Sequence, residues 1–224
     1  MKLIAVPARS MRLLALFCLF FLSFLSACSP LQPAVRATVY DFGPGALKQT
    51  AASASTSLSP LVLGEIQTSG ALDGSAVLYR LAYSDPLQPR PYAQARWSKP
   101  PGQLLRQRLS EQLGMHRTVL RAGQGVLTTA PAIGLHVELD EFSQLFETPD
   151  KSSGLVRARV TLGRWMAGGS EQFLAQRTFV VQHPSASADA AGGVHALNQA
   201  CDALIGEILQ WLQQVDADLG QSRL

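Results

Sequence analysis

The 224-residue chain has 47% hydrophobic, 16% charged and 7% aromatic residues, a composition that excludes an extended disordered protein and leaves room for one ordinary domain. Its formal net charge of +3 comes from 19 Lys and Arg against 16 Asp and Glu, and the surplus lies in the first 27 residues as Lys2, Arg9 and Arg12. The remainder is balanced and lacks the positive charge that nucleic-acid binding requires, so that class of function is set aside.

The N-terminus has the pattern of a secretory signal. The apolar run 13–25 is interrupted only by Ser23, and it is shorter than the roughly 20 apolar residues that cross a bilayer. The run ends in Leu25-Ser26-Ala27-Cys28, which resembles the bacterial lipobox, where the cysteine sulfur receives a diacylglycerol. We therefore predict a lipoprotein signal peptide over residues 1–27. The alternative is an ordinary secretory signal with a cysteine nearby by chance.

Lipidation of Cys28 would hold the protein at a membrane, because two or three acyl chains anchor far more firmly than one. Residues 28–37 then form a tether. By resemblance to lipoprotein sorting in diderm bacteria, Ser29 in place of Asp favours the periplasmic face of the outer membrane over the inner membrane.

Cysteine use excludes an intramolecular disulfide in the mature chain. Cys18 leaves with the predicted signal and Cys28 becomes a thioether, so Cys201 remains alone. Cys201 falls on the apolar stripe of a predicted helix, which favours a buried structural cysteine over a reactive thiol.

The first half of the mature chain is predicted to contain strands at 38–42, 61–67 and 77–83. The small-residue stretch 46–59 separates the first two strands and predicts a flexible connection. Turn signals around Gly70 predict that the second and third strands pair with each other.

A helix is predicted after a proline-rich segment. The prolines expected to break the chain before a short piece at 92–97 are Pro86, Pro89 and Pro91. Pro100-Pro101 suits the first helical positions and Gly114 suits a helix end. The leucines that form one apolar face between these limits are Leu104, Leu105, Leu109 and Leu113.

The middle of the chain carries the clearest β pattern. Apolar residues alternate with polar ones over 133–140 and again over 156–162, so each strand has one wet face. If the two strands pair as a hairpin, acids on one would meet arginines on the other. A further strand is predicted at 173–181.

The last predicted helix has apolar residues spaced alternately three and four apart. They are Val194, Leu197, Cys201, Leu204, Ile208, Trp211 and Val215. Ile205 and Leu212 widen the stripe, which favours packing on a sheet over a coiled coil or a partner-facing helix.

The order of these elements predicts an α+β fold, with a largely antiparallel sheet and two main helices packed on one face. We expect a single domain over residues 38–219 behind the lipidated N-terminus.

Recognisable catalytic motifs are absent from the sequence, including the phosphate-binding loop, the nucleophile elbow and H-E-x-x-H. The four histidines are far apart in sequence, so no metal site is predicted, and we expect no cofactor. The acids at 140–150 are interpreted as a solvated strand end and loop. The enzyme alternative is an envelope hydrolase that uses Asp140 and Glu141.

Several segments in order resemble the ABC-type transport auxiliary lipoprotein family. The segments that carry the resemblance are the lipobox, Tyr40-Asp41-Phe42, Tyr79-Arg80, Tyr92, Arg96-Trp97-Ser98-Lys99-Pro100-Pro101, Leu139-Asp140-Glu141-Phe142, Ala196-Leu197, Ala200 and Trp211-Leu212. Together they cover residues 25–215.

The resemblance implies a non-enzymatic periplasmic lipoprotein of an intermembrane lipid transport system. Its partners would be an ABC permease and ATPase and a protein of the mammalian-cell-entry (MCE) type, and the chain would dock the transport conduit at the outer membrane. A homo-oligomer is left open. Tyr79, Arg96 and Trp97 are candidate partner contacts, with a core role as the alternative for Trp97. The rival function is a lipoprotein that regulates peptidoglycan synthesis or outer-membrane assembly.

Overall fold

The computed structural model describes residues 36–45, 58–68, 70–121, 132–166 and 170–221. The predicted signal peptide, Cys28, nearly all of the tether and most of the connection 46–59 lie outside the described residues. The elements are β1 (Thr38–Tyr40), β2 (Leu61–Leu63), the 3-10 helix η2 (Gly70–Asp73), β3 (Ala76–Leu81), β4 (Asp85–Trp97), α2 (Pro101–Gly114), β5 (Val119–Arg121), β6 (Ile133–Thr148), β7 (Lys151–Trp165), β8 (Glu171–Pro184) and α3 (Ala190–Gln221).

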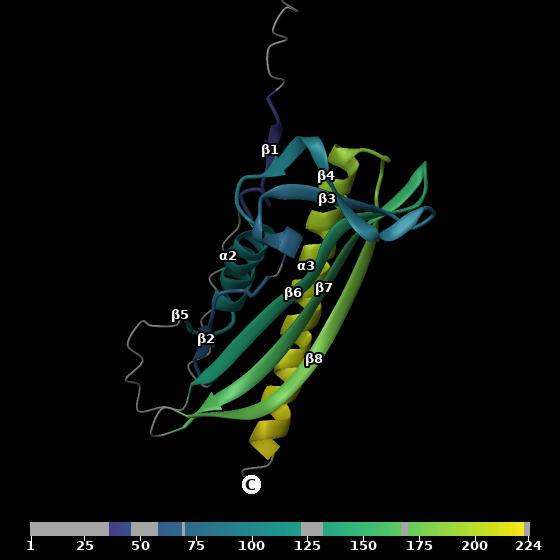
Figure 1. Cartoon of the computed structure of the whole chain (residues 1–224). Helices are drawn as coiled ribbons and strands as arrows, with labels where there is room; N and C mark the ends of the chain where they lie inside the picture. Colours follow the sequence, from purple (N-terminus) through teal and green to yellow (C-terminus); the bar gives the residue numbers. More distant parts are fainter. Residues whose placement is uncertain (1–35, 46–57, 69, 122–131, 167–169, 222–224) are drawn as a thin grey trace, which may run out of the picture. The chain divides into compact units, whose positions relative to one another are not determined.

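The strands form one mixed sheet around β6 (Figure 1). On one side, β6 pairs antiparallel with β7, and β7 pairs antiparallel with β8. The other edge of β6 is shared, because residues 133–135 pair with β2 and residues 144–146 pair with β3. β5 continues from β2, and β4 and β1 continue from β3. The predicted α+β class is confirmed; its longest pairings are antiparallel, and short parallel pairings complete the sheet.

The predicted pairing of the second and third strands is wrong. Both β2 and β3 run parallel to β6, so they run parallel to each other and cannot form a hairpin. The turn signals after β2 instead form η2, where the Thr68 hydroxyl donates a 2.6 Å hydrogen bond to the Asp73 carboxylate.

β4 also departs from expectation, because it runs through Pro86, Pro89 and Pro91 without a break. Only residues 95–97 of β4 pair with β1, so the proline-containing part has β3 on one side and an open edge on the other. A proline at an open edge costs no ladder hydrogen bond. Register shifts between β3 and β4 accommodate the remaining irregularity.

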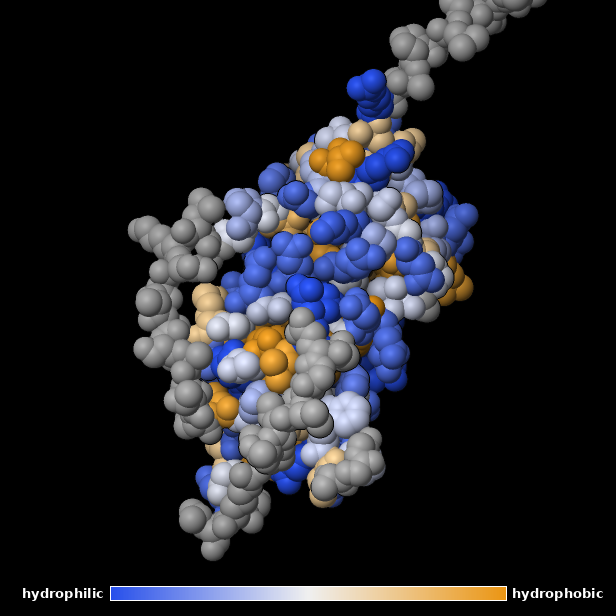
Figure 2. Space-filling model, turned by 90° about the vertical axis from the view of Figure 1, so that its left-hand side faces the viewer, coloured by the Kyte–Doolittle hydropathy of each residue, from blue (hydrophilic) through white to orange (hydrophobic). Residues whose placement is uncertain are grey.

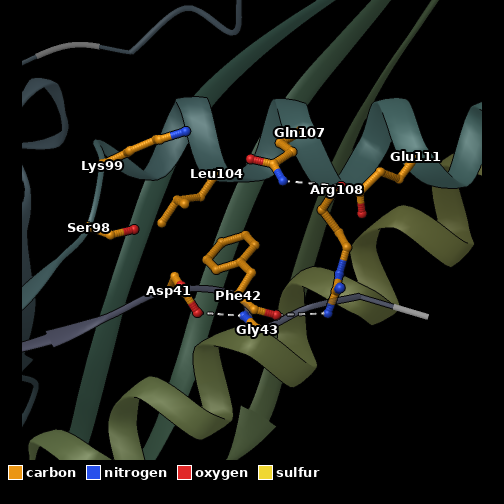
Figure 3. A pocket seen from close by; sticks show the side chains of 9 residues that line it. All are labelled: Asp41, Phe42, Gly43, Ser98, Lys99, Leu104, Gln107, Arg108 and Glu111. Carbon is orange, nitrogen blue, oxygen red and sulfur yellow. Dashed lines mark hydrogen bonds between the residues drawn. The ribbon is translucent and has the colours of Figure 1, made fainter. Parts of the chain in front are cut away.

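Both helices cover the same face of the sheet (Figures 1 and 3). α2 begins at Pro101 and ends at Gly114, as predicted, and its four apolar-face leucines are buried. α3 lies on β7, β8 and β6, which confirms that its apolar stripe packs on the sheet. The fully buried core side chains include Leu135, Leu197 and Phe179.

Cys201 lies in this core and is completely buried, which confirms the structural interpretation. Burial raises the pKa of its thiol, and the nearby Asp202 carboxylate adds to that effect. The thiolate that redox or nucleophilic chemistry requires is therefore disfavoured.

The opposite face of the sheet is polar along residues 136–140 of β6 and 157–161 of β7, as the alternation predicted. In the β6–β7 hairpin Glu138 lies opposite Arg159, and their side chains form an ion pair of 3.4 Å. Asp140 lies 3.9 Å from both Arg157 and Arg159.

α3 crosses β7 at very close range near the helix N-terminus. A Cβ on Gly154 would stand 2.5 Å from the backbone of Ala196 and Leu197. On the helix, a Cβ on Gly193 would meet the side-chain amide of Gln144 on β6. Glycine at both positions allows the two backbones to approach this closely.

Candidate functional site

The segments Tyr40-Asp41-Phe42 and Arg96–Pro101 are far apart in sequence and meet in the structure. The two strands pair in parallel, with Tyr40 opposite Trp97. The backbone N–H of Ser98 then donates a 2.7 Å hydrogen bond to the carbonyl of Tyr40. The end of β1 is thereby fixed against the turn that opens α2.

Three buried aromatic rings pack against one another next to this junction. The Phe42 ring meets the Trp97 ring edge-on with centroids 5.7 Å apart and stacks on Phe142 at 6.1 Å. Trp97 and Phe142 meet at 5.5 Å. All three side chains are buried, so β1, β4 and β6 share one aromatic cluster.

Arg108 of α2 links the junction to α3. Its guanidinium donates a 3.1 Å hydrogen bond to the carbonyl of Phe42 and forms a 3.1 Å ion pair with Asp202. The Asn198 amide of α3 donates to the carbonyl of Asp41 at 3.3 Å. Two consecutive carbonyls after β1 are therefore held by side chains from two different helices.

The chain turns sharply after Phe42. The Gly43 N–H donates a 2.8 Å hydrogen bond to the Asp41 carboxylate, and Gly43 has a φ of 70°, a conformation that favours glycine.

A cavity of about 140 Å³ opens over this turn (Figure 3). Its lining residues are Asp41, Phe42, Gly43, Ser98, Lys99, Leu104, Gln107, Arg108 and Glu111. The cavity is smaller than the roughly 300–1,000 Å³ of ordinary small-molecule pockets. It therefore fits a water cluster or one inserted side chain of a partner better than a metabolite.

A larger hollow of about 370 Å³ lies on the other side of Arg108, between α2 and α3. Ile205 and Leu209 supply its apolar lining and Asp202 a carboxylate. Figure 2, which views the molecule from the side of α2, shows a mainly hydrophilic surface with small separate hydrophobic areas.

The candidate contact residues do not form one cluster. Arg96 is exposed on β4 opposite Val39, which is 58% exposed. Trp97 points to the other face and is 1% exposed, so it has the core position that was its alternative interpretation. Tyr79 belongs to a separate group, with its ring 4.7 Å from Tyr92 and 5.9 Å from Phe146.

The acids at 140–150 are engaged in structural contacts. Glu141 is buried and forms a 3.0 Å ion pair with Arg80. Glu147 pairs with Lys151 at 2.6 Å, and Asp150 accepts a hydrogen bond from the Thr148 hydroxyl. These contacts position strands and a turn.

Within the described ranges, no group of three or more His, Cys, Asp and Glu side chains could hold a metal ion. Across the same part of the chain, no helix combines the length and apolar character needed to span a membrane.

Sequence reasoning missed Arg108, Asp202 and Asn198. Arg108 lies on the polar side of α2, and its ion-pair partner Asp202 is 94 residues away in the sequence. No local sequence pattern therefore indicates that the two residues are in contact. Only the packing of α2 beside α3 brings them together.

A family model described as the ABC-type transport auxiliary lipoprotein component matches residues 40–209. A crystal structure of a Xanthomonas campestris protein assigned to the DUF330 family model is similar in fold, with a TM-score of 0.65 and 20% identity over 83% of this chain and 99% of that chain. A second solved structure, described only as an uncharacterized protein, has a TM-score of 0.57 and 16% identity over 79% of this chain and 99% of that one. The comparison with curated proteins finds no match.

Proposed function

Because the chain belongs to the family of ABC-type transport auxiliary lipoprotein components, we propose that it is a non-enzymatic periplasmic subunit of an MCE-type intermembrane lipid transport system. It would be anchored by acylated Cys28 at the periplasmic face of the outer membrane and dock the transport conduit there. Its partners would be an MCE-domain protein and the ABC permease and ATPase of the same system.

The single observation that carries this proposal is the family match over residues 40–209, directly behind an N-terminus with the lipoprotein pattern. Membership supports association with a transport system and a location at an envelope membrane. The site is consistent with a docking role, since its parts connect β1 to both helices and the cavity over the turn after Phe42 is small.

The proposed docking face surrounds the start of the domain. Arg96 and Val39 lie opposite each other on neighbouring strands, with Arg96 exposed and Val39 58% exposed. Paired residues of a sheet share a face, so a cation and an apolar side chain are presented side by side. Trp97 and the aromatic cluster behind it hold this part of the sheet in place, and Tyr79 supports β4 from β3.

Affinity capture of the lipidated protein from gently solubilised envelopes tests the function. We expect mass spectrometry to find an MCE-domain protein among the partners and a diacylated N-terminal peptide beginning at Cys28. Cys28→Ala should lose the acyl chains and the membrane fraction, whereas Cys201→Ala should keep both. Recovery of cell-wall synthases without an MCE protein would replace the transport function with the rival regulatory one.

Two further variants test the location and the docking face. Ser29→Asp should move the protein from outer-membrane to inner-membrane fractions on a density gradient. Arg96→Glu should reduce recovery of the MCE partner. Arg177→Glu, which reverses an exposed arginine on β8, is the matched control and should leave recovery unchanged. Equal loss in both arginine variants would contradict the assignment of this face.

A further inference from the structure

The β7–β8 hairpin exposes three large hydrophobic side chains at one end of the sheet. Trp165 is 39% exposed, Met166 46% and Phe173 65%. Trp165 ends β7, and Phe173 lies near the start of β8. A backbone hydrogen bond joins the two strands at this end, because the Met166 N–H donates to the carbonyl of Ser170 at 2.9 Å.

The register places the two aromatic side chains on the same face. Phe173 lies opposite Gly163, and Trp165 lies two residues beyond Gly163, so their side chains point to the same side of the sheet. Leu162, the residue before Gly163 on β7, is buried in the core on the side of α3, so the side of Gly163 and Trp165 faces away from the helices. Phe173 therefore projects into solvent, and Trp165, whose indole lies beside Gly134, keeps part of its ring exposed.

The described end of the β7–β8 hairpin carries one acid and one arginine. Its acid, Glu171, lies across Gly134 and Gly163 and makes contacts of 2.8 and 3.0 Å with His136. A Cβ on either glycine would collide with the Glu171 carboxylate, so the glycines leave room for the side chain to turn back along the sheet. Arg164, the neighbour of Trp165 on β7, points to the opposite face of the strand and has no acidic partner among the described residues, so one cation stands at the same end of the hairpin as the aromatic side chains.

We propose that this tip inserts into the headgroup region of a lipid bilayer that contains anionic lipids. Indole and phenyl side chains match this boundary, where tryptophan is enriched, and Arg164 projects from the other face of the same hairpin end. Three side chains at a hairpin end are far less than the roughly 1,000 Å² that a stable protein interface buries. They are enough to bind a bilayer weakly on their own and to add a second membrane contact to a protein already held at a surface.

The tip lies far from the start of the domain. β6 meets β7 beside the tip at Ile133 and meets Phe42, which follows β1, at Phe142, and nine residues of strand span about 30 Å. Contact at the tip would add a second point of attachment and orient the domain on the membrane, which an anchor at one end alone does not do.

The three tryptophans provide a built-in test. Trp97 and Trp211 are 1% and 8% exposed, whereas Trp165 is 39% exposed, so a fluorescence change on membrane contact reports chiefly on Trp165. The assay uses the full mature chain with Cys28→Ala, which removes the acyl chains. Its result does not depend on an MCE partner, so it succeeds or fails independently of the proposed function.

With vesicles of phosphatidylethanolamine and phosphatidylglycerol we expect co-sedimentation, a blue shift of the emission and weaker quenching by iodide. Trp165→Phe should remove the spectral change while retaining sedimentation. Phe173→Ser should weaken binding about tenfold or more, because burying one such side chain is worth about 1.5–3 kcal/mol. Arg164→Gln, or vesicles of phosphatidylcholine alone, should also weaken binding.

Leu87→Ser is the matched control, since Leu87 is 86% exposed and lies in β4 away from the tip. It should change binding less than twofold. Absence of sedimentation and of any spectral change would overturn the proposal. Equal weakening by Leu87→Ser and Phe173→Ser would overturn it as well, because binding would then be general hydrophobic adsorption.

Discussion

The hydroxyl of Tyr92 on β4 donates a 2.7 Å hydrogen bond to the side-chain oxygen of Gln144, a fully buried residue on β6. The Gln144 amide in turn donates to the Ser152 hydroxyl on β7 at 2.8 Å. One polar chain therefore ties β4, β6 and β7 together beneath the N-terminus of α3, where Gly193 lies against Gln144.

Tyr92→Phe should lower the free energy of unfolding by about 1–3 kcal/mol, because the Gln144 oxygen would lose its donor while staying buried. Urea or guanidinium unfolding measures the change. Tyr83→Phe is the control, since Tyr83 is 49% exposed, and it should change stability by less than 0.5 kcal/mol, as is usual for surface sites. Equal effects of the two substitutions would show that the Gln144 contact contributes nothing.

Stability should fall as the pH rises above about 9. Burial raises the pKa of Cys201 above its ordinary value of 9.0 and that of Tyr92 above 10.0. The unfolded chain therefore loses these protons first, and the folded state binds more protons than the unfolded state in this range. Stability is complete below the ordinary pKa values and declines above them, by up to about 1.4 kcal/mol per pH unit for buried Cys201 and by less for half-buried Tyr92, whose phenol is screened by solvent.

Unfolding curves at pH 8, 9, 10 and 11 check this dependence. The double variant Cys201→Ala and Tyr92→Phe should start from lower stability and lose less of it between pH 9 and 11. An unchanged slope in the double variant would assign the alkaline sensitivity to other groups.

Gly154→Ala should destabilise the protein by about 1–3 kcal/mol, because the added methyl meets helix backbone at 2.5 Å and backbone moves only at a cost. Gly206→Ala on α3 provides the contrast. A Cβ there meets nothing within 4 Å, so alanine should stabilise the helix by about 0.5–1 kcal/mol. Thermal unfolding separates the two, and a tolerated Gly154→Ala would show that α3 can move away from β7.

Two ion pairs, one buried and one exposed, should differ sharply in their contribution to the free energy of unfolding. Arg117 is 4% exposed, and its guanidinium contacts Asp216 near the C-terminal end of α3. Asp216→Ala leaves that charge buried without its partner and should cost about 3–5 kcal/mol. Glu138→Ala breaks a pair whose side chains are 43% and 44% exposed and should cost less than about 1 kcal/mol.

Chemical denaturation at low and high salt tests this contrast. The effect of Glu138→Ala should shrink further in high salt, because exposed charges are screened. If Asp216→Ala also costs less than 1 kcal/mol, Arg117 finds solvent or another acceptor when Asp216 is removed.

The parts of the fold that could be predicted from sequence are those with a long periodic signal. The α3 stripe and the alternation along β6 and β7 repeat often enough to define element type, burial and the β6–β7 pairing. β2 and β3 are three and six residues long, and nothing in such short segments specifies a partner. The pairing of β2 and β3 with β6 depends on tertiary packing. The closeness of β2 and β3 in the sequence therefore predicted the wrong pairing, of these two strands with each other.

The site was predictable only in part, for the same reason. The tryptophan before Pro100-Pro101 marks the start of α2, and the sequence places it beside Arg96. The contacts of Arg108 with Phe42 and Asp202 span 66 and 94 residues. Such contacts follow from how helices lie on the sheet, which local patterns do not encode.

The position of β1 has a mechanical consequence. A pull on the N-terminal segment reaches the domain through β1, whose hydrogen bonds to β4 run across the strand direction. Tension along β1 therefore loads these bonds together in shear instead of opening them one after another. The hydrogen bonds from Asn198 to the Asp41 carbonyl and from Arg108 to the Phe42 carbonyl follow β1 directly in the chain and also bear part of this force. A force on the N-terminal end of the domain is thus shared among β4, α2 and α3 instead of being borne by β1 alone.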